Sequence, residues 1–267
     1  MIRRPAVAGA FYPYEADRLE KQIRSYLKEV PHKEKVKGVV APHAGYIYSG
    51  GVAGAVYSRV EIPADVVVLG PNHRGMGAAH AVMASGTWDM PAGPIKINEV
   101  LAKNIMEHSG LFRNDASAHK YEHSLEVQIP FIQAFQPEAQ LVPIVLSASS
   151  YKECEELGKA LAAGIRDYGR DVLMVASTDM THYESHEAVQ KKDRKAIEKI
   201  LAMDPEGLLH TVLGSGISMC GVVSTTVVLV ACMELGARSA ELVAYATSGD
   251  ASGDYEQVVG YAGLIIR

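Results

Sequence analysis

The feature that most constrains the fold of this chain is a series of short, almost uninterrupted apolar runs, each followed by polar or turn-forming residues. The runs cover residues 37–42, 64–70, 80–84, 139–146, 171–177, 241–247 and 259–266. Alternating polar and apolar residues are typical of strands with one wet face, whereas continuous apolar runs are typical of strands covered on both faces. The runs therefore predict a sheet that is buried between two layers.

Helical patterns lie between these runs. They cover residues 15–29, 98–109, 122–135, 151–168, 186–201 and 217–235. Strands that alternate with helices predict an α/β/α sandwich around a central, mostly parallel or mixed sheet. No repeat, low-complexity tract or linker divides the chain, so we expect residues 1–267 to form a single domain.

Composition and missing motifs exclude several classes of protein. The formal net charge of −5 argues against a nucleic-acid partner. The longest apolar stretch, residues 220–237, contains Ser and Thr and predicts a buried helix, so we expect no membrane partner. Three cysteines and a polar N-terminal stretch without signal-peptide features predict a cytoplasmic protein. Dinucleotide, P-loop and nucleophile-elbow motifs are absent.

Polar residues with metal-binding or catalytic potential follow three of the apolar runs. His43 follows the run 37–42, His73 follows 64–70, and Asp179 and His182 follow 171–177. Ligands of open parallel sheets bind outside the carboxyl ends of the strands. A single histidine after a strand is usually a loop residue, but three such events favour one shared site. We therefore expect the side chains of His43 and His73 to lie within about 10 Å of each other, as a common metal requires.

A cysteine is the next candidate in the chain. Cys220 lies in a Gly/Ser-rich segment at or near the start of the predicted helix 217–235, where helix amides would lower the pKa of its thiol. The alternative is a small buried residue, which we favour for Cys232. Two imidazoles and one thiolate suit Zn, Cu or Fe(II), but not Mg or Ca.

Two further segments carry polar clusters. Glu122, His123 and Glu126 fall within about one turn of the predicted helix 122–135, and a charged helix start is the competing interpretation. Residues 247–254, "TSGDASGD", predict a turn-rich loop with acidic caps and no chemistry.

Taken in order, several motifs resemble those of the Memo-like family, which is widespread in archaea and bacteria and present in eukaryotes. They are "AGAFYP", "PHAGYIYSG", "GPNHRG", "YEHSLEVQIPF", "STDMTHY" and "CG" before a long helix. The resemblance runs from about residue 3 to the end of the sequence. The family is similar in fold to class III extradiol ring-cleavage dioxygenases, which hold non-haem Fe(II) with two histidines and a carboxylate.

The resemblance implies roles for particular residues. His43 and His73 match the two histidine ligands, and His182 matches the additional acid/base histidine, with Asp179 close by. Cys220 stands where the dioxygenases have a ligating glutamate. Because a thiolate is softer than a carboxylate, this departure favours Cu(I) or Zn more than a dioxygenase iron site does. Kinship of fold therefore does not carry dioxygenase activity across.

The cofactor implied is one transition metal, with Fe(II) or Cu favoured and Zn as the alternative. Prokaryotic members of the family are grouped with an AMMECR-type protein and a radical-SAM protein, which are therefore the partner proteins to expect.

Three hypotheses about function follow. The first is a mononuclear metal site made by His43, His73 and Cys220, in a redox enzyme whose open coordination position takes O₂ or substrate. His182 would move a proton, and Asp179 would orient His182 or bind water. The second is a non-catalytic module that binds an aromatic or phosphorylated ligand or peptide, and the third, weaker one is a metal-dependent hydrolase.

Four residues are candidates for contacting the ligand: Tyr12, Tyr46, Arg74 and His123. Tyr48 is a further candidate for the pocket lining. Arg74 would pair with an anion, although a solvated surface arginine is the competing interpretation.

Overall fold

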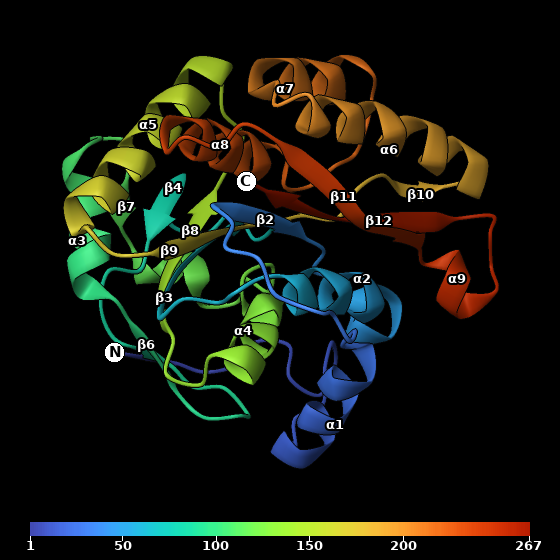
Figure 1. Ribbon diagram of the computed structural model, residues 1–267, viewed down its shortest axis with the longest axis horizontal. Coiled ribbons are helices and arrows are strands. Elements are labelled where there is room, and N and C mark those ends of the chain that lie inside the picture. The colour runs from blue at the N-terminus through green and yellow to red at the C-terminus, as the bar shows by residue number, and fades with distance from the viewer.

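A mixed sheet runs through the whole molecule, and helices cover both of its faces (Figure 1). The structure is a computed structural model that describes residues 1–267. The strands follow the order β1 (Ile2–Arg3), β5 (Thr87–Trp88), β6 (Ile95–Ile97), β8 (Gln140–Leu146), β3 (Asp65–Pro71), β9 (Val172–Ser177), β2 (Gly38–Ala41), β12 (Val258–Ile266) and β10 (His182–Glu184). Outside this path, β11 (Ala240–Thr247) pairs with β12, β4 (His80–Val82) with β8, and β7 (Arg113–Asn114) with β4. The predicted α/β sandwich is confirmed.

The centre of the sheet consists of four parallel strands, β8, β3, β9 and β2. Their carboxyl ends therefore meet at one edge. Every residue of β3 is buried, and successive valines enter opposite cores: Val66 and Val68 pack on one face, and Val67 packs on the other. This alternation explains the apolar runs, because on a strand covered on both faces a polar side chain needs a partner inside the protein, as Asp65 at the start of β3 has in Asn98 and Tyr168.

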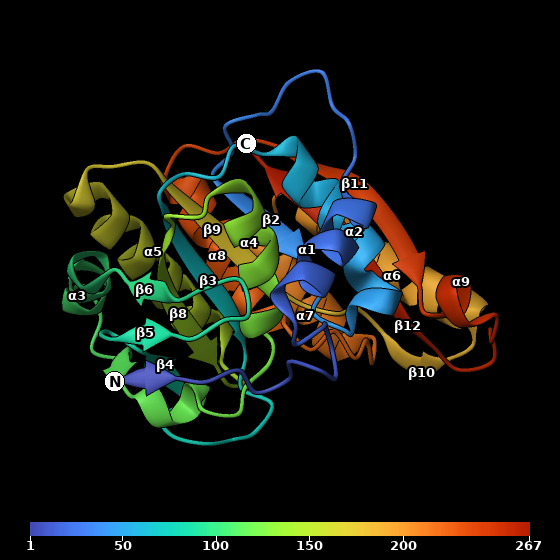
Figure 2. The ribbon, with the colours of Figure 1, turned by 90° about the horizontal axis from the view of Figure 1, so that it is seen from below.

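The helices form two layers, which Figure 2 shows from below. One layer holds α3 (Glu99–Glu107), α5 (Tyr151–Tyr168), α6 (His186–Leu201), α7 (Pro205–Gly214) and α8 (Val222–Glu234). The opposite layer holds α1 (Ala16–Tyr26), α2 (Tyr46–Arg59) and α4 (Ile129–Phe135). Shorter elements are α9 (Gly249–Ser252) and the 3₁₀ turns η1 (Ala116–His119) and η2 (Glu126–Gln128). None of the helices has both the length and the apolar composition needed to cross a membrane.

Helix α2 is not predicted by the sequence, because its glycines weaken a helical pattern. The structure gives two of them a packing role. A Cβ atom on Gly50 would lie 2.4 Å from the ring of Tyr26, and one on Gly54 would lie 2.5 Å from the backbone oxygen of Tyr26. The glycines let α2 approach the end of α1 closely.

The prediction of one helix over 122–135 is wrong in its first half. Residues 122–125 are not helical, and only α4 and the preceding turn η2 follow. The carboxylate of Glu122 accepts the backbone N–H groups of His123 and Ser124, at 2.9 and 2.8 Å. Local bonds of this kind compete with helix formation. They leave His123 in an irregular segment that turns toward the sheet edge.

Candidate metal centre

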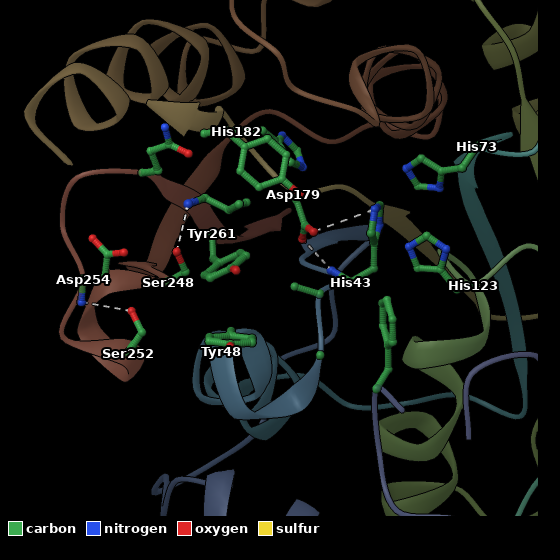
Figure 3. A pocket seen from close by; sticks show the side chains of 16 residues that line it. His43, Tyr48, His73, His123, Asp179, His182, Ser248, Ser252, Asp254 and Tyr261 are labelled. Atoms are coloured by element: carbon green, nitrogen blue, oxygen red, sulfur yellow. Dashed lines mark hydrogen bonds and ion pairs between the residues drawn. The ribbon is translucent and has the colours of Figure 1, made fainter. Parts of the chain in front are cut away.

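Three histidines meet in a cavity of about 510 Å³ at the carboxyl edge of the sheet (Figure 3). The ring centroids of His43 and His73 are 5.2 Å apart, those of His43 and His123 5.4 Å, and those of His73 and His123 4.6 Å. Each imidazole offers one ring nitrogen within 4.8 Å of the other two. His43 and His73 therefore come together as the sequence predicts. His123, a candidate for ligand contact, lies beside them.

The ring of His43 is oriented by a hydrogen-bond network beneath the pocket. The hydroxyl of Ser177 donates to the carbonyl oxygen of Ser124 at 2.5 Å, so its single proton is used. Its oxygen accepts from the side-chain amide of Gln128 at 2.7 Å and lies 3.0 Å from Nδ1 of His43. The proton in that contact must therefore come from Nδ1. This tautomer leaves the lone pair of Nε2 on His43 free for a ligand.

Glu122 plays the same part for His73. One carboxylate oxygen accepts from Nδ1 of His73 at 2.9 Å, and the other accepts the backbone N–H of His73 at 2.7 Å. Nδ1 of His123 lies 3.4 Å from the same carboxylate. Carboxylates that hold the far nitrogen of an imidazole are typical of metal-binding histidines. Burial opposes the ionisation of Glu122, but the hydrogen bond and charge of His73 lower its pKa to about 2.

Burial favours the neutral form of two of the imidazoles, those of His43 and His123, and the neutral form is the one that binds a metal. It lowers the pKa of His43 well below its usual range, and the neighbouring His123, His73 and His182 add to the effect. Burial also lowers the pKa of His123 to about 4. Metals bind the neutral ring, so the donor set fits a transition-metal ion. The nitrogens need only a small side-chain adjustment to share an ion with bonds of roughly 2 Å.

Cys220 lies against the same ring nitrogen. Its Sγ is 3.2 Å from Nε2 of His43 and accepts the backbone N–H of Asp179 at 3.2 Å. Helix α8 begins at Val222, later than predicted, because residues before it are bonded to the turn after β9: the N–H of Cys220 reaches the carbonyl of Asp179 at 3.3 Å.

The prediction of a lowered thiol pKa at Cys220 is wrong. Burial raises the pKa, and the charge of Asp179 raises it further. Desolvation of the thiolate outweighs the amides at the helix start. The thiol of Cys232 is wholly buried and its pKa is also raised by burial, as expected for a packing residue.

Asp179 and His182 complete the floor of the pocket. Oδ1 of Asp179 accepts the backbone N–H of His43 at 2.7 Å, and Oδ2 lies 4.0 Å from Nε2 of the same residue. Burial raises the pKa of Asp179 to about 6. Nδ1 of His182 lies 3.0 Å from the carbonyl oxygen of Ser218, which only accepts, so Nδ1 carries the proton. Nε2 of His182 is left as an acceptor.

The other predicted contact residues lie elsewhere. Tyr12 and Tyr46 are buried outside the pocket lining, because each hydroxyl is used inside the protein: Tyr12 donates to Glu126 at 2.5 Å and Tyr46 to the carbonyl of Val127 at 2.6 Å. Arg74 is exposed and donates to the carbonyl of Tyr121 at 3.2 Å, also outside the lining. Tyr48 does line the pocket.

The sequence analysis missed the outer wall of the pocket. The cavity is also lined by Ser248 just before α9, by Ser252 at its end, and by Asp254 and Gln257 after it, although no chemistry was expected of residues 247–254. The available signal was positional: this loop joins β11 to β12, a strand that pairs with β2. Its residues are thereby brought to the same edge as the histidines.

A histidine-rich pocket outside the carboxyl ends of the central parallel strands defines an α/β protein with a candidate ligand site at its sheet edge. The family model described as Memo-like protein matches residues 3–265. The chain is 44% identical to a MEMO1 family protein of Pyrobaculum arsenaticum and 42% identical to one of Methanopyrus kandleri, each over 100% of this chain and 99% of the relative. A MEMO1 family protein of Aquifex aeolicus is 41% identical over 99% of this chain and 98% of its own length. The chain belongs to the Memo-like family.

Proposed function

We propose that this protein binds one transition-metal ion through His43, His73 and Cys220, and that it is a metal-dependent redox enzyme. The observation that carries the proposal is the convergence of the His43 and His73 imidazoles. Nδ1 of His43 is hydrogen-bonded to Ser177 and Nδ1 of His73 to Glu122, so that Nε2 of each ring is available to a metal. His123 faces the same point and competes with Cys220 as third ligand. A mixed nitrogen and sulfur set favours Fe(II) or Cu, with Zn as the alternative. When bound, such an ion supplies Lewis-acid or redox chemistry.

The surrounding residues have separate tasks in this proposal. His182 has a free acceptor nitrogen on the pocket side and exchanges a proton with the ligand. Asp179 fixes the loop of His43 by accepting its backbone N–H, and its buried carboxylate adds negative charge beside the centre. The unpaired state of all three cysteines fits the reducing cytoplasm proposed as its location.

A binding module without turnover is the second candidate. The aromatic wall of the pocket supports it, since Phe11, Tyr48, Tyr183 and Tyr261 offer ring surfaces to a ligand. Arg74 does not reach that wall, so the residue expected to recognise a phosphate is not in place.

Titration calorimetry with Fe(II), Cu(I) and Zn(II) under anaerobic conditions tests the metal centre. The His43→Ala variant should lose metal binding. The His182→Ala variant should keep the metal and lose turnover, because an acid/base step contributes about 10²–10⁴-fold. The exposed His32 supplies a matched control, and His32→Ala should change nothing.

The same titration identifies the third ligand. A larger loss in Cys220→Ser than in His123→Ala supports the thiolate, and the reverse order supports three imidazoles. Equal loss in His43→Ala and His182→Ala would make His182 a ligand and overturn the division of roles. Unchanged binding in every variant would mean that the histidines are structural.

A further inference from the structure

The pocket has two chemically different ends, which are separated by aromatic rings (Figure 3). The histidines lie at one end. Asp254, with Ser248 and Ser252, lies at the other, and the rings of Tyr48 and Tyr261 stand between them. A ligand that fills the cavity must therefore offer metal-binding atoms at one end and a different group at the other.

The far end carries uncompensated negative charge. No lysine or arginine is among the residues that line the cavity, whereas Asp254 lies at this end and Asp179 lies beside His43 at the other. One oxygen of Asp254 accepts the backbone N–H of Glu256 at 2.9 Å, and the other has no partner. Residues 247–257 contain Asp250, Asp254 and Glu256, and none of them forms an ion pair. Glu184 on nearby β10 differs, because it pairs with Lys192 at 2.6 Å.

The rim holds an exposed ring on a strained backbone. Tyr183 has a φ of 57°, in the left-handed region, and its side chain lines the pocket although the residue is 72% exposed. This conformation costs an ordinary residue roughly 1–2 kcal/mol. The pairing of β10 with β12 shifts register at this point. Strain of this kind clusters at ligand sites, and the open faces of tyrosines attract both aromatic rings and cations.

We propose that the pocket selects an aromatic ligand that carries a positively charged amine at the end away from the histidines. The ring packs among Tyr48, Tyr183 and Tyr261, and the ammonium faces Asp254. A phosphate or carboxylate in that position would meet a carboxylate and no cation. This inference rests on the proposed metal centre and deepens it, since it names the class of ligand.

Three catechols with matched rings test the selection: dopamine, 4-ethylcatechol and 3-(3,4-dihydroxyphenyl)propionate. Adjacent hydroxyls chelate a metal, and the three tails are cationic, neutral and anionic. Calorimetry uses the full chain loaded with redox-inert Zn(II), without oxygen. Dopamine should bind roughly tenfold more tightly than the propionate, and high salt should shrink the difference.

Substitutions assign the preference to one residue. Asp254→Asn should reduce the ratio of the two affinities roughly threefold or more, and Asp254→Lys should invert it. Glu138→Gln is the matched control, because Glu138 is exposed just before the start of β8, at the opposite end of the sheet. It should leave the ratio unchanged.

Tyr183→Gly separates ligand contact from architecture. Glycine tolerates a φ of 57°, so the variant should unfold at the same or a higher denaturant concentration while all three catechols bind more weakly. Unchanged catechol affinity in this variant would remove Tyr183 from the ligand site.

The outcomes distinguish the inference from the function on which it rests. Failure to bind Fe(II), Cu(I) and Zn(II) alike would overturn the metal centre and the inference together; if Zn(II) alone fails to bind, the same comparison is made with Fe(II) in the absence of oxygen. Zinc binding with no uptake of any catechol would leave the metal centre standing and refute the aromatic ligand. Equal binding of dopamine and the propionate, or a preference that Asp254→Lys leaves intact, would overturn only the selection by charge.

Discussion

The two edges of the sheet use charged and polar residues in opposite ways. At the amino edge, Arg59 contacts Glu34 and Glu241 at 2.6 and 2.5 Å, and Arg267 contacts the same two carboxylates at 2.7 Å each. Each charged group of this ion-pair network has an oppositely charged partner within the protein. At the carboxyl edge, Nδ1 of His43 is hydrogen-bonded to Ser177 and Nδ1 of His73 to Glu122, and both residues line a cavity.

Residue type alone therefore does not identify a functional site in this protein. The amino-edge network contains more charged groups, but these groups pair with one another and offer no free charge to a ligand. The pKa of Glu34 is lowered to about 2, first by the hydrogen bonds from Arg267 and Arg59. At the carboxyl edge, chemistry is indicated by imidazole nitrogens whose lone pairs are available to a ligand. Substitutions at the two edges should therefore affect different measurements.

The largest expected effect is on metal affinity at the carboxyl edge. His73→Ala removes a proposed ligand and should weaken binding of the preferred ion more than 100-fold, beyond the roughly 10–100-fold that loss of a supporting residue costs. The free energy of unfolding without metal should fall by only roughly 1–3 kcal/mol, because the buried carboxylate of Glu122 loses one hydrogen-bond partner while the His73 side chain itself is 30% exposed. Calorimetry and urea denaturation on the same samples compare the two quantities. Loss of stability with intact metal binding would make His73 a packing residue.

The next effect sharpens the role of the supporting carboxylate. Glu122→Gln places an amide beside Nδ1 of His73 and should weaken metal binding about 10–100-fold. Because the carboxylate also accepts three backbone N–H groups, the variant should lose roughly 1–3 kcal/mol of stability. Metal affinity equal to that of the unchanged protein would show that Glu122 only shapes the loop.

The smallest effect belongs to the amino edge. Glu34→Gln should cost about 1 kcal/mol or less at pH 7, because these partly exposed pairs are screened by water, and should leave metal affinity unchanged. The folded-state pKa of Glu34 lies below its ordinary value, so its stabilisation is present above about pH 4.5 and is lost as the pH falls toward about 2. Urea denaturation at pH 7 and pH 3 gives the comparison. A difference between the two proteins that grows on acidification would contradict this sign.

The sequence predicts those parts of the fold that are fixed locally. Helix α5 has the predicted bounds, since Ser150 and Glu153 form a capping box at its start and Gly169 ends it with a φ of 71°. His43 and His73 could be assigned to one edge because parallel strands fix where the chain emerges. The sulfur of Cys220, which is predicted to be a ligand, lies beside Nε2 of His43.

The parts that escaped prediction depend on contacts between distant segments. The bond between Glu122 and His73 joins residues 49 positions apart, and no periodic pattern encodes it. The same holds for α2, because its glycines are required only by the close contact of Gly50 and Gly54 with Tyr26. The raised pKa of Cys220 comes from burial under neighbouring segments, which a motif at a helix start does not reveal.

The place of β12 inside the sheet has a consequence for biosynthesis. Val40 of β2 pairs with Leu264, roughly 220 residues later along the chain, and Val259 and Tyr261 of the same late strand also line the pocket. At a translation rate of roughly 5–20 residues per second, β2 waits about ten seconds or more for its neighbour to be synthesised. During that interval its open edge is a liability for aggregation on the ribosome. A metal ion that reaches the nascent chain before β12 is made would meet the histidines of the pocket without Val259 and Tyr261, which later line it.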